Sequence, residues 1–315
     1  MVAEHADRGR YGYLGPENTF CHQALLSLPD APADPVPYPS VLLALDAVRA
    51  GEIDAALVPI ENSVEGGVSA TLDDLTYGEP LRIVAEVLLP VQFNLYARGG
   101  TELADVHRVI SHPHAIAQVR QWLTTHLPQV QIVTEGSTAA GAVTVADPES
   151  GFDATVCAAV AGQANGLTAL ATEIADNADA VTRFVLVTRP GPPPERTSAD
   201  KTTVVVFLND DDAGSLMRML EQFASRGVNL SRIESRPSRL VRGAYSFSID
   251  AHGHLDDERV AGALKGVKRT SREVVFLGSY PRADKVRPAV ERGHTDGDYR
   301  AANDWLEGLT DPHAG

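Results

Sequence analysis

Short apolar runs alternate with alanine-rich stretches over the first two thirds of the chain. The apolar runs are typical of buried strands and occupy residues 81–89, 106–110, 130–133 and 183–188. The stretches between them have helical spacing, and they predict helices near residues 40–50, 114–126 and 137–146. Strands that alternate with helices indicate an α/β architecture with a largely parallel sheet.

The segment of residues 55–68, AALVPIENSVEGGV, carries the most information. A buried strand runs here into three polar side chains, Glu61, Asn62 and Ser63. Pro59 has no N–H for a ladder, so we expect the strand to stop there or to lie at a sheet edge. Gly66 and Gly67 then allow a tight turn or a close approach to a ligand. Ligands of open α/β sheets bind beyond the carboxyl ends of strands, so these polar residues fit a binding site. A strand, a turn and a helix with Asn62 or Ser63 as its N-cap also fit the pattern.

Residues 189–200, RPGPPPERTSAD, concentrate proline, glycine and charge, which is typical of an extended linker. We therefore expect one domain on each side of this segment. The predicted boundaries are 11–189 for the first domain, 190–200 for the linker, 201–280 for the second domain and 281–315 for a tail.

The second domain has a different order of elements. We predict a strand, a helix, two strands, a helix and a strand at 202–208, 214–226, 228–235, 244–249, 255–264 and 273–280. Gly227 is placed to end the first of these helices. The order βαββαβ predicts a ferredoxin-like module. In the tail we expect a short helix around 301–309 and partial mobility elsewhere.

Composition and charge narrow the classes of function. The 315 residues carry a formal net charge of −15, which argues against non-specific binding to nucleic acid. Cys21 and Cys157 are too few for a disulfide framework or a thiolate metal site. The spacing of His112 and His114 would place them on opposite helical sides, so it disfavours a metal pair. With no signal-peptide pattern or long apolar run, we predict a cytoplasmic protein that does not bind membranes.

Five stretches of the first domain share uncharged hydrogen-bonding side chains at the predicted strand ends. They are Tyr13–Phe20 (YLGPENTF), Pro59–Ser63 (PIENS), Ser111–Gln118 (SHPHAIAQ), Ser137–Thr138 and Thr182–Phe184 (TRF). In this order and at these spacings, the set resembles the prephenate dehydratases, which convert prephenate into phenylpyruvate on the route to phenylalanine. The resemblance extends from about residue 11 to residue 280.

The resemblance implies a catalytic domain of two α/β lobes, similar to periplasmic binding proteins, with prephenate between the lobes. It also implies that the C-terminal module is an ACT domain, which binds L-phenylalanine as a feedback inhibitor. We expect a monofunctional enzyme, because the ten residues before residue 11 cannot supply a chorismate mutase domain. A homodimer or homotetramer, and no metal or other cofactor, follow from the same resemblance.

The resemblance also assigns residues. The catalytic set is Thr182, Arg183, Phe184, Asn62, Ser63, Ser111 and Gln118. Substrate binding is expected of Thr19, Glu61, Ser137 and Thr138. The phenylalanine site is expected at Gly214, Ser215, Leu216, Met217, Glu234, Ser235, Arg236 and Pro237.

The chemistry gives several of these residues a role. Thr182 would donate a hydrogen bond to the departing hydroxyl, and Arg183 would hold the pyruvyl carboxylate. Phe184 fits core packing better than a stack on the substrate. Ser111 also fits an N-cap for the helix that follows it, whose first N–H groups would attract an anion. Glu61 fits either a base or a structural acceptor.

Two further hypotheses remain open. An arogenate dehydratase performs the same elimination on a substrate with an amino group in place of the keto group. A small-molecule sensor would bind a ligand between the lobes without turnover. A dinucleotide-dependent dehydrogenase is disfavoured because no G-x-G-x-x-G follows the first strand.

Overall fold

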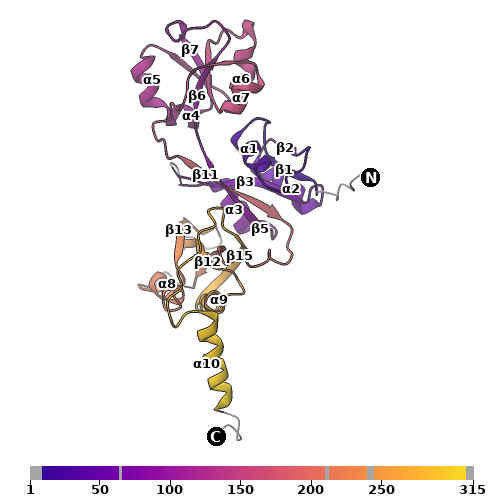
Figure 1. Cartoon of the computed structure of the whole chain (residues 1–315), viewed down its shortest axis with the longest axis vertical. Helices are drawn as coiled ribbons and strands as arrows, with labels where there is room; N and C mark the ends of the chain where they lie inside the picture. The colour runs from indigo at the N-terminus through magenta and orange to yellow at the C-terminus, as the bar shows by residue number, and fades with distance from the viewer. Residues whose placement is uncertain (1–8, 64–65, 210–212, 240–244, 310–315) are drawn as a thin grey trace. The chain divides into compact units, whose positions relative to one another are not determined.

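A computed structural model describes residues 9–63, 66–209, 213–239 and 245–309 (Figure 1). Its contacts divide the chain into two compact units. The first comprises the described residues of Met1–Asp74 and Val87–Val187, and the second those of Leu75–Glu86 and Thr188–Gly315. Across the described ranges, no helix is both long enough and apolar enough to cross a membrane.

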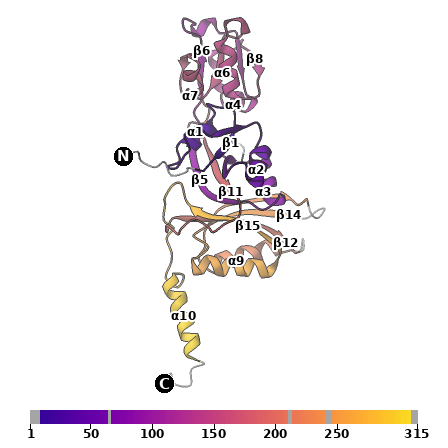
Figure 2. The same cartoon turned by 90° about the vertical axis from the view of Figure 1, so that its right-hand side faces the viewer.

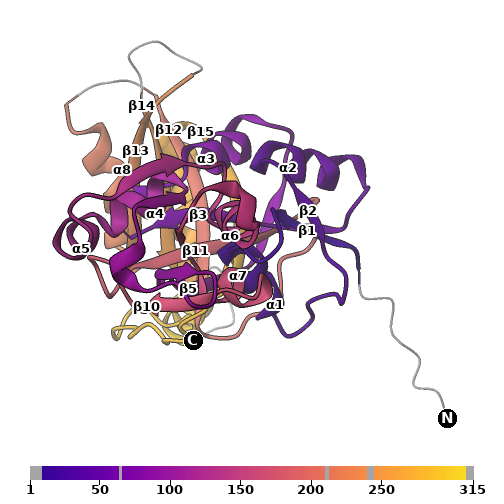
Figure 3. The same ribbon diagram turned by 90° about the horizontal axis from the view of Figure 1, so that it is seen from above.

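The first sheet has the strand order β2-β1-β3-β11-β5, and the short β4 pairs with β3. Its strands are β1 (Tyr11–Leu14), β2 (Val36–Tyr38), β3 (Ala55–Asn62), β4 (Gly66–Gly67), β5 (Arg82–Pro90) and β11 (Val181–Thr188). Its helices are α1 (Phe20–Leu26), α2 (Val41–Ala50) and α3 (Ser69–Tyr77). β1 pairs in parallel with β2 and β3, and α1 and α2 lie against these strands (Figure 3).

The expectation that the third strand stops at Pro59 or lies at an edge is wrong. β3 continues through Pro59 to Asn62 and lies between β1 and β11. The register with β1 ends at Leu57, so the missing N–H of Pro59 lies beyond that ladder.

The second sheet has the order β10-β6-β9-β7-β8. Its strands are β6 (Asn94–Ala97), β7 (Arg108–Ser111), β8 (Gln131–Thr134), β9 (Ala154–Cys157) and β10 (Thr168–Ala171). The α-helices are α4 (Pro113–Gln118), α5 (Arg120–His126), α6 (Thr138–Ala146) and α7 (Ala159–Ala164), with 3₁₀ turns η1 (Leu103–Asp105) and η2 (Pro148–Ser150). β7 pairs in parallel with β8 and β9, whereas β6 pairs antiparallel with β9 and β10, so this sheet is mixed rather than largely parallel. The helix predicted at 114–126 is broken at Val119 into α4 and α5.

The second unit contains the βαββαβ module that the sequence predicts. Its elements are β12 (Asp200–Leu208), α8 (Ser215–Ala224), β13 (Leu230–Pro237), β14 (Tyr245–His252), α9 (Glu258–Thr270) and β15 (Ser271–Pro281). The antiparallel sheet has the order β13-β14-β12-β15, and α9 covers one face of it (Figure 2). Val204 and Ile249 of the sheet pack with Phe223 of α8 and Val267 of α9 in a buried core.

The fold class is therefore confirmed: a mixed α/β unit with two sheets, as expected for two lobes, precedes a ferredoxin-like module. α9 begins three residues later and ends six residues later than the predicted helix at 255–264. The start of the predicted strand at Ala244 lies outside the described residues. The tail helix α10 (Asp296–Gly308) begins earlier than predicted, because Thr295 and Asp298 form a capping box.

Candidate active site

The end of β3 lies beside the start of β11, and this contact joins three of the predicted catalytic residues. Asn62 Nδ2 donates a hydrogen bond of 3.1 Å to Thr182 Oγ1. Ser63 N–H donates to Val181 O at 3.0 Å, and Val181 N–H donates to Ser63 Oγ at 2.9 Å. Thr182 is only 8% exposed. Among the described residues, Asn62 is the only hydrogen-bond partner of Thr182 Oγ1, so its own proton has no acceptor there.

The neighbouring residues form a second pair. Arg183 is buried, and its NH1 lies 3.4 Å from Oε2 of Glu61. Successive side chains of a strand point to opposite faces, so this pair lies on the face opposite to Asn62 and Thr182. The geometry thus places Arg183 away from the Thr182 hydroxyl, and it gives Glu61 the role of an acceptor for a buried cation. Phe184 is buried, in agreement with core packing.

The segment that follows β3 contains the two glycines, which form β4. β4 pairs antiparallel with the end of β3, with Asn62 opposite Gly66, and Gly66 has a φ of +85° that favours glycine. Val64 and Glu65 of this segment lie outside the described residues. The following helix, α3, begins only at Ser69, so the expectation that Asn62 or Ser63 caps a helix is wrong.

A second group of predicted residues belongs to the other sheet of the first unit. Ser111 is fully buried, and its Oγ donates a hydrogen bond of 2.5 Å to Val156 O. The N-cap of α4 is His112, whose Nδ1 accepts from His114 N–H at 3.2 Å, so the N-cap assignment of Ser111 is wrong. At the end of α4, Gln118 has a buried Oε1 without a hydrogen-bond partner among the described residues.

The predicted pair Ser137–Thr138 begins α6. Ser137 Oγ accepts from Ala140 N–H at 3.0 Å as the N-cap, and Thr138 is the first helical residue. β7 and β8 are parallel neighbours, and their last residues, Ser111 and Thr134, lie opposite each other. Because α6 is the next helix after β8, Ser111 and the start of α6 belong to adjacent strand ends. The free N–H groups at the start of this nine-residue helix favour an anion.

The spacing predicts that His112 and His114 point to opposite sides of a helix, and this prediction is wrong. His112 precedes α4, and the two rings meet edge to face with centroids 5.0 Å apart. Within the described ranges, no three His, Cys, Asp or Glu side chains gather as ligands for a metal ion. Burial raises the pKa of the Cys21 and Cys157 thiols to about 12, so neither is a ready nucleophile.

The first loop contains a packed group that sequence reasoning missed. Thr19 caps α1 and donates to Pro16 O at 2.9 Å. The ring of His22, one turn further, stacks on Tyr13 with centroids 4.6 Å apart, and its Nδ1 accepts from Asn18 N–H at 3.1 Å. Burial lowers the pKa of His22 and raises the pKa of Tyr13 to about 12. The available signal was a histidine three residues after the capping threonine.

The predicted phenylalanine-binding segments lie on α8 and β13 of the second unit. Gly214 precedes α8 with a φ of +88°, and Met217 in the first turn is 74% exposed. On β13, the carboxylate of Glu234 lies 3.1 Å from NH1 of Arg232 and 3.2 Å from NH1 of Arg236. β13 is an edge strand of this sheet, so one side of its backbone has no partner strand among the described residues.

Comparison with known proteins decides the family. The family model described as prephenate dehydratase matches residues 11–192. This chain belongs to the prephenate dehydratase family. The match covers the whole set of motifs from the first loop to Thr182–Phe184.

Relatives support the assignment over nearly the full length. A prephenate dehydratase of Amycolatopsis methanolica is 47% identical over 94% of this chain and 96% of its own length. The structure of a prephenate dehydratase from Arthrobacter aurescens in complex with L-Phe is 52% identical, with a TM-score of 0.89 over 95% of this chain and 99% of that one. A structure described as GqqA, a novel type of quorum quenching acylase, is 30% identical, with a TM-score of 0.75 over 86% of this chain and 97% of that one. Because proteins with the same fold can be assigned different activities, the assignment of prephenate dehydratase activity depends on the family match and the site residues rather than on the fold.

Proposed function

We propose that this chain is a hydro-lyase that converts prephenate into phenylpyruvate. The ring carboxylate leaves as CO₂, and the ring hydroxyl takes up a proton and leaves as water. Aromatisation of the ring drives the reaction, so the difficult step is the departure of a poor leaving group. The observation that carries the proposal is the hydrogen bond from Asn62 to Thr182.

That hydrogen bond sets the direction of the Thr182 proton. Because Oγ1 accepts from Asn62 Nδ2, the O–H of Thr182 is available to a leaving hydroxyl. A preorganised donor of this kind contributes about 10²–10³ in kcat, or about 2.7–4 kcal/mol. Burial of Thr182 keeps competing water away from the donor.

A different role follows for Arg183. A cation on the departing carboxylate would stabilise the ground state more than the transition state. The sequence therefore assigns Arg183 to the pyruvyl carboxylate, but its pairing with Glu61 on the opposite strand face favours a positioning role. We propose that Arg183 holds the end of β3 through Glu61, and thereby holds Asn62 against Thr182.

The group in the second sheet would bind the rest of the substrate. We propose that Ser111, Gln118, Ser137, Thr138 and the first N–H groups of α6 position prephenate with neutral hydrogen bonds. The buried Oε1 of Gln118 supports this, because an unpaired polar atom carries a desolvation cost that a ligand donor would remove. Thr19 would contribute from the first loop.

The test is phenylpyruvate formation from prephenate. Thr182→Ala should lower kcat by about 10²–10³, while Thr188→Ala at the far end of the same strand should leave it unchanged. A loss of less than tenfold in the first variant would contradict the role of Thr182. Arogenate is assayed in parallel, and faster turnover of arogenate would reassign the substrate.

Regulation by L-phenylalanine is part of the proposal. The amino acid's carboxylate would bind at the start of α8, at Gly214–Met217, and the rest of the ligand would contact Glu234–Pro237 of β13. The exposed Met217 and the edge position of β13 support a site completed by a second module. Calorimetry on the intact protein should detect phenylalanine binding, coupled to turnover by about 1–3 kcal/mol. Absence of binding would refute the regulatory proposal without affecting the catalytic one.

The remaining assignments belong to the same proposal. We place the catalytic domain at 11–189, the linker at 190–200, the ACT domain at 201–280 and the tail at 281–315. A homodimer or homotetramer in the cytoplasm completes it, and sedimentation at several protein concentrations tests the oligomeric state.

A further inference from the structure

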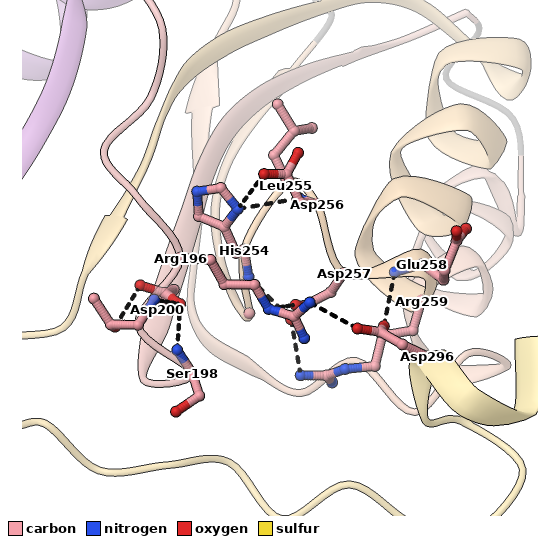
Figure 4. Close-up of polar contacts among 12 residues, drawn as sticks. Arg196, Ser198, Asp200, His254, Leu255, Asp256, Asp257, Glu258, Arg259 and Asp296 are labelled. Carbon is pink, nitrogen blue, oxygen red and sulfur yellow. Dashed lines mark hydrogen bonds and ion pairs between the residues drawn. The ribbon is translucent and has the colours of Figure 1, made fainter. Parts of the chain in front are cut away.

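The helix α10 is fixed at its first turn by charged contacts (Figure 4). Arg196 Nε lies 2.7 Å from Asp257 Oδ1, and its NH1 lies 2.7 Å from Asp296 Oδ2. Asp296 Oδ1 also accepts from Glu258 N–H at 3.1 Å. These contacts tie the first turn of α10 to the first turn of α9 and to the segment before β12.

The other end of α10 presents large apolar side chains to solvent. Trp305, Leu306 and Leu309 are 67%, 58% and 63% exposed. Leu309 lies four residues from Trp305 and three from Leu306, so the three share one side of the helix. A helix of 13 residues is marginal in water without packing. The end of α10 is therefore suited to a partner surface.

A groove with complementary chemistry lies at the other end of α9. Its volume is about 790 Å³, and it is lined by Arg226, Gly262, Leu264, Lys265, Lys268 and Arg269. Leu264 supplies an apolar contact, and the lysines and arginines surround it. α10 carries four carboxylates and a single arginine, so its charge is opposite to that of the groove. Both Asp304 and Glu307 flank the apolar residues.

We propose that the end of α10 docks into this groove on a second copy of the chain. Within one copy, the first turn of α10 is held at the start of α9, whereas the groove is formed by the later turns of α9. Figures 1 and 2 both show α10 directed away from α8 and α9, so its own groove is out of reach. Two copies related by a twofold axis would form the contact twice, since each offers both a helix and a groove.

Fluorescence of Trp305 tests the contact. The chain has two tryptophans, so Trp122→Phe leaves Trp305 as the only one. Docking predicts emission at shorter wavelength than in the unfolded chain. Reversing the groove charges with Lys265→Glu and Lys268→Glu should shift the emission to longer wavelength and lower the mass of the assembly. Adding Asp304→Lys and Glu307→Lys should restore both readouts, whereas Arg120→Glu with Arg272→Glu, a matched reversal on other exposed sites, should change neither.

A mixed assembly separates docking between copies from docking within one copy. The first copy carries Trp305 and the reversed groove, and the second copy carries Phe at both tryptophan positions and the native groove. The two are co-expressed with different affinity tags and purified through both tags. Recovery of the short-wavelength emission in the mixed assembly is the expected result. The proposal is overturned if the emission of the mixed assembly remains at long wavelength or if the two copies fail to purify together. It is also overturned if reversing the groove charges has no effect.

Discussion

Replacing Asn62 with aspartate should reverse the hydrogen bond that, in the proposed mechanism, directs the Thr182 proton to the substrate. In the native protein, Asn62 Nδ2 donates to Thr182 Oγ1 at 3.1 Å. A carboxylate of the same shape can only accept, so the Thr182 O–H would turn toward residue 62 and away from the leaving hydroxyl. Asn62→Asp should therefore remove the donor as completely as Thr182→Ala does.

The magnitudes of three substitutions should differ in a defined order. Loss of the donor costs about 2.7–4 kcal/mol, or 10²–10³ in kcat, in both Asn62→Asp and Thr182→Ala. Asn62→Ala removes the orienting hydrogen bond to Thr182, worth about 0.5–1.5 kcal/mol, and leaves the Thr182 proton free to reach the substrate. That range corresponds to a loss of about two- to tenfold. The isosteric change should thus be more harmful than the truncation.

The double variant separates the reversed hydrogen bond from repulsion of the anionic substrate. With Thr182→Ala in place, no proton remains to be misdirected, so adding Asn62→Asp should not lower kcat further. Repulsion would instead raise KM in both backgrounds. Initial rates of phenylpyruvate formation over a range of prephenate concentrations give kcat and KM for each variant. An Asn62→Asp enzyme as fast as Asn62→Ala would refute the proposed direction of the proton.

Two further predictions concern buried charges and titration. Glu86→Gln removes the carboxylate that lies 2.8 Å from Lys201 Nζ, where both side chains are almost fully buried. It should lower the free energy of unfolding in urea by about 3–5 kcal/mol, because a buried ammonium is left without its partner. Adding Lys201→Met removes that charge and should recover most of the loss. Burial lowers the pKa of His22 below 6.5, so the unfolded chain binds more protons and the free energy of unfolding falls as pH drops through 6.5. His22→Gln should weaken this dependence, which urea titrations on either side of pH 6.5 would measure.

The order of elements was predictable because each element carries its own pattern. The β-branched run of β12 and the amphipathic α8, followed by Gly227, specify the beginning of the βαββαβ module locally. The break at Val119 was not predictable, because neither glycine nor proline marks it. The N-cap of α4 was misassigned because both Ser111 and His112 have suitable acceptors, and only the contact of Ser111 with Val156, 45 residues away, decides between them.

The candidate site shows a similar limit. Asn62 and Thr182 are 120 positions apart, and only the pairing of sheet strands brings them together. The strand order β3-β11 depends on contacts across the whole first unit, which the local pattern of either segment does not contain. The set of polar residues was accessible from the motifs, whereas their grouping into two clusters on separate sheets was not.

The motif Thr182-Arg183-Phe184 illustrates why adjacent residues need not serve the same task. In a strand, neighbours point to opposite faces, so a motif of three residues presents its first and third side chains on one side and its second on the other. The contacts follow this rule, since Thr182 meets Asn62 and Arg183 meets Glu61. Both pairs join the same two strands, so the ion pair on one face restrains the register that the hydrogen bond on the other face requires. Arg183, next to the proposed catalytic hydroxyl in sequence, is thus suited to support that hydroxyl from the opposite strand face rather than to contact the substrate.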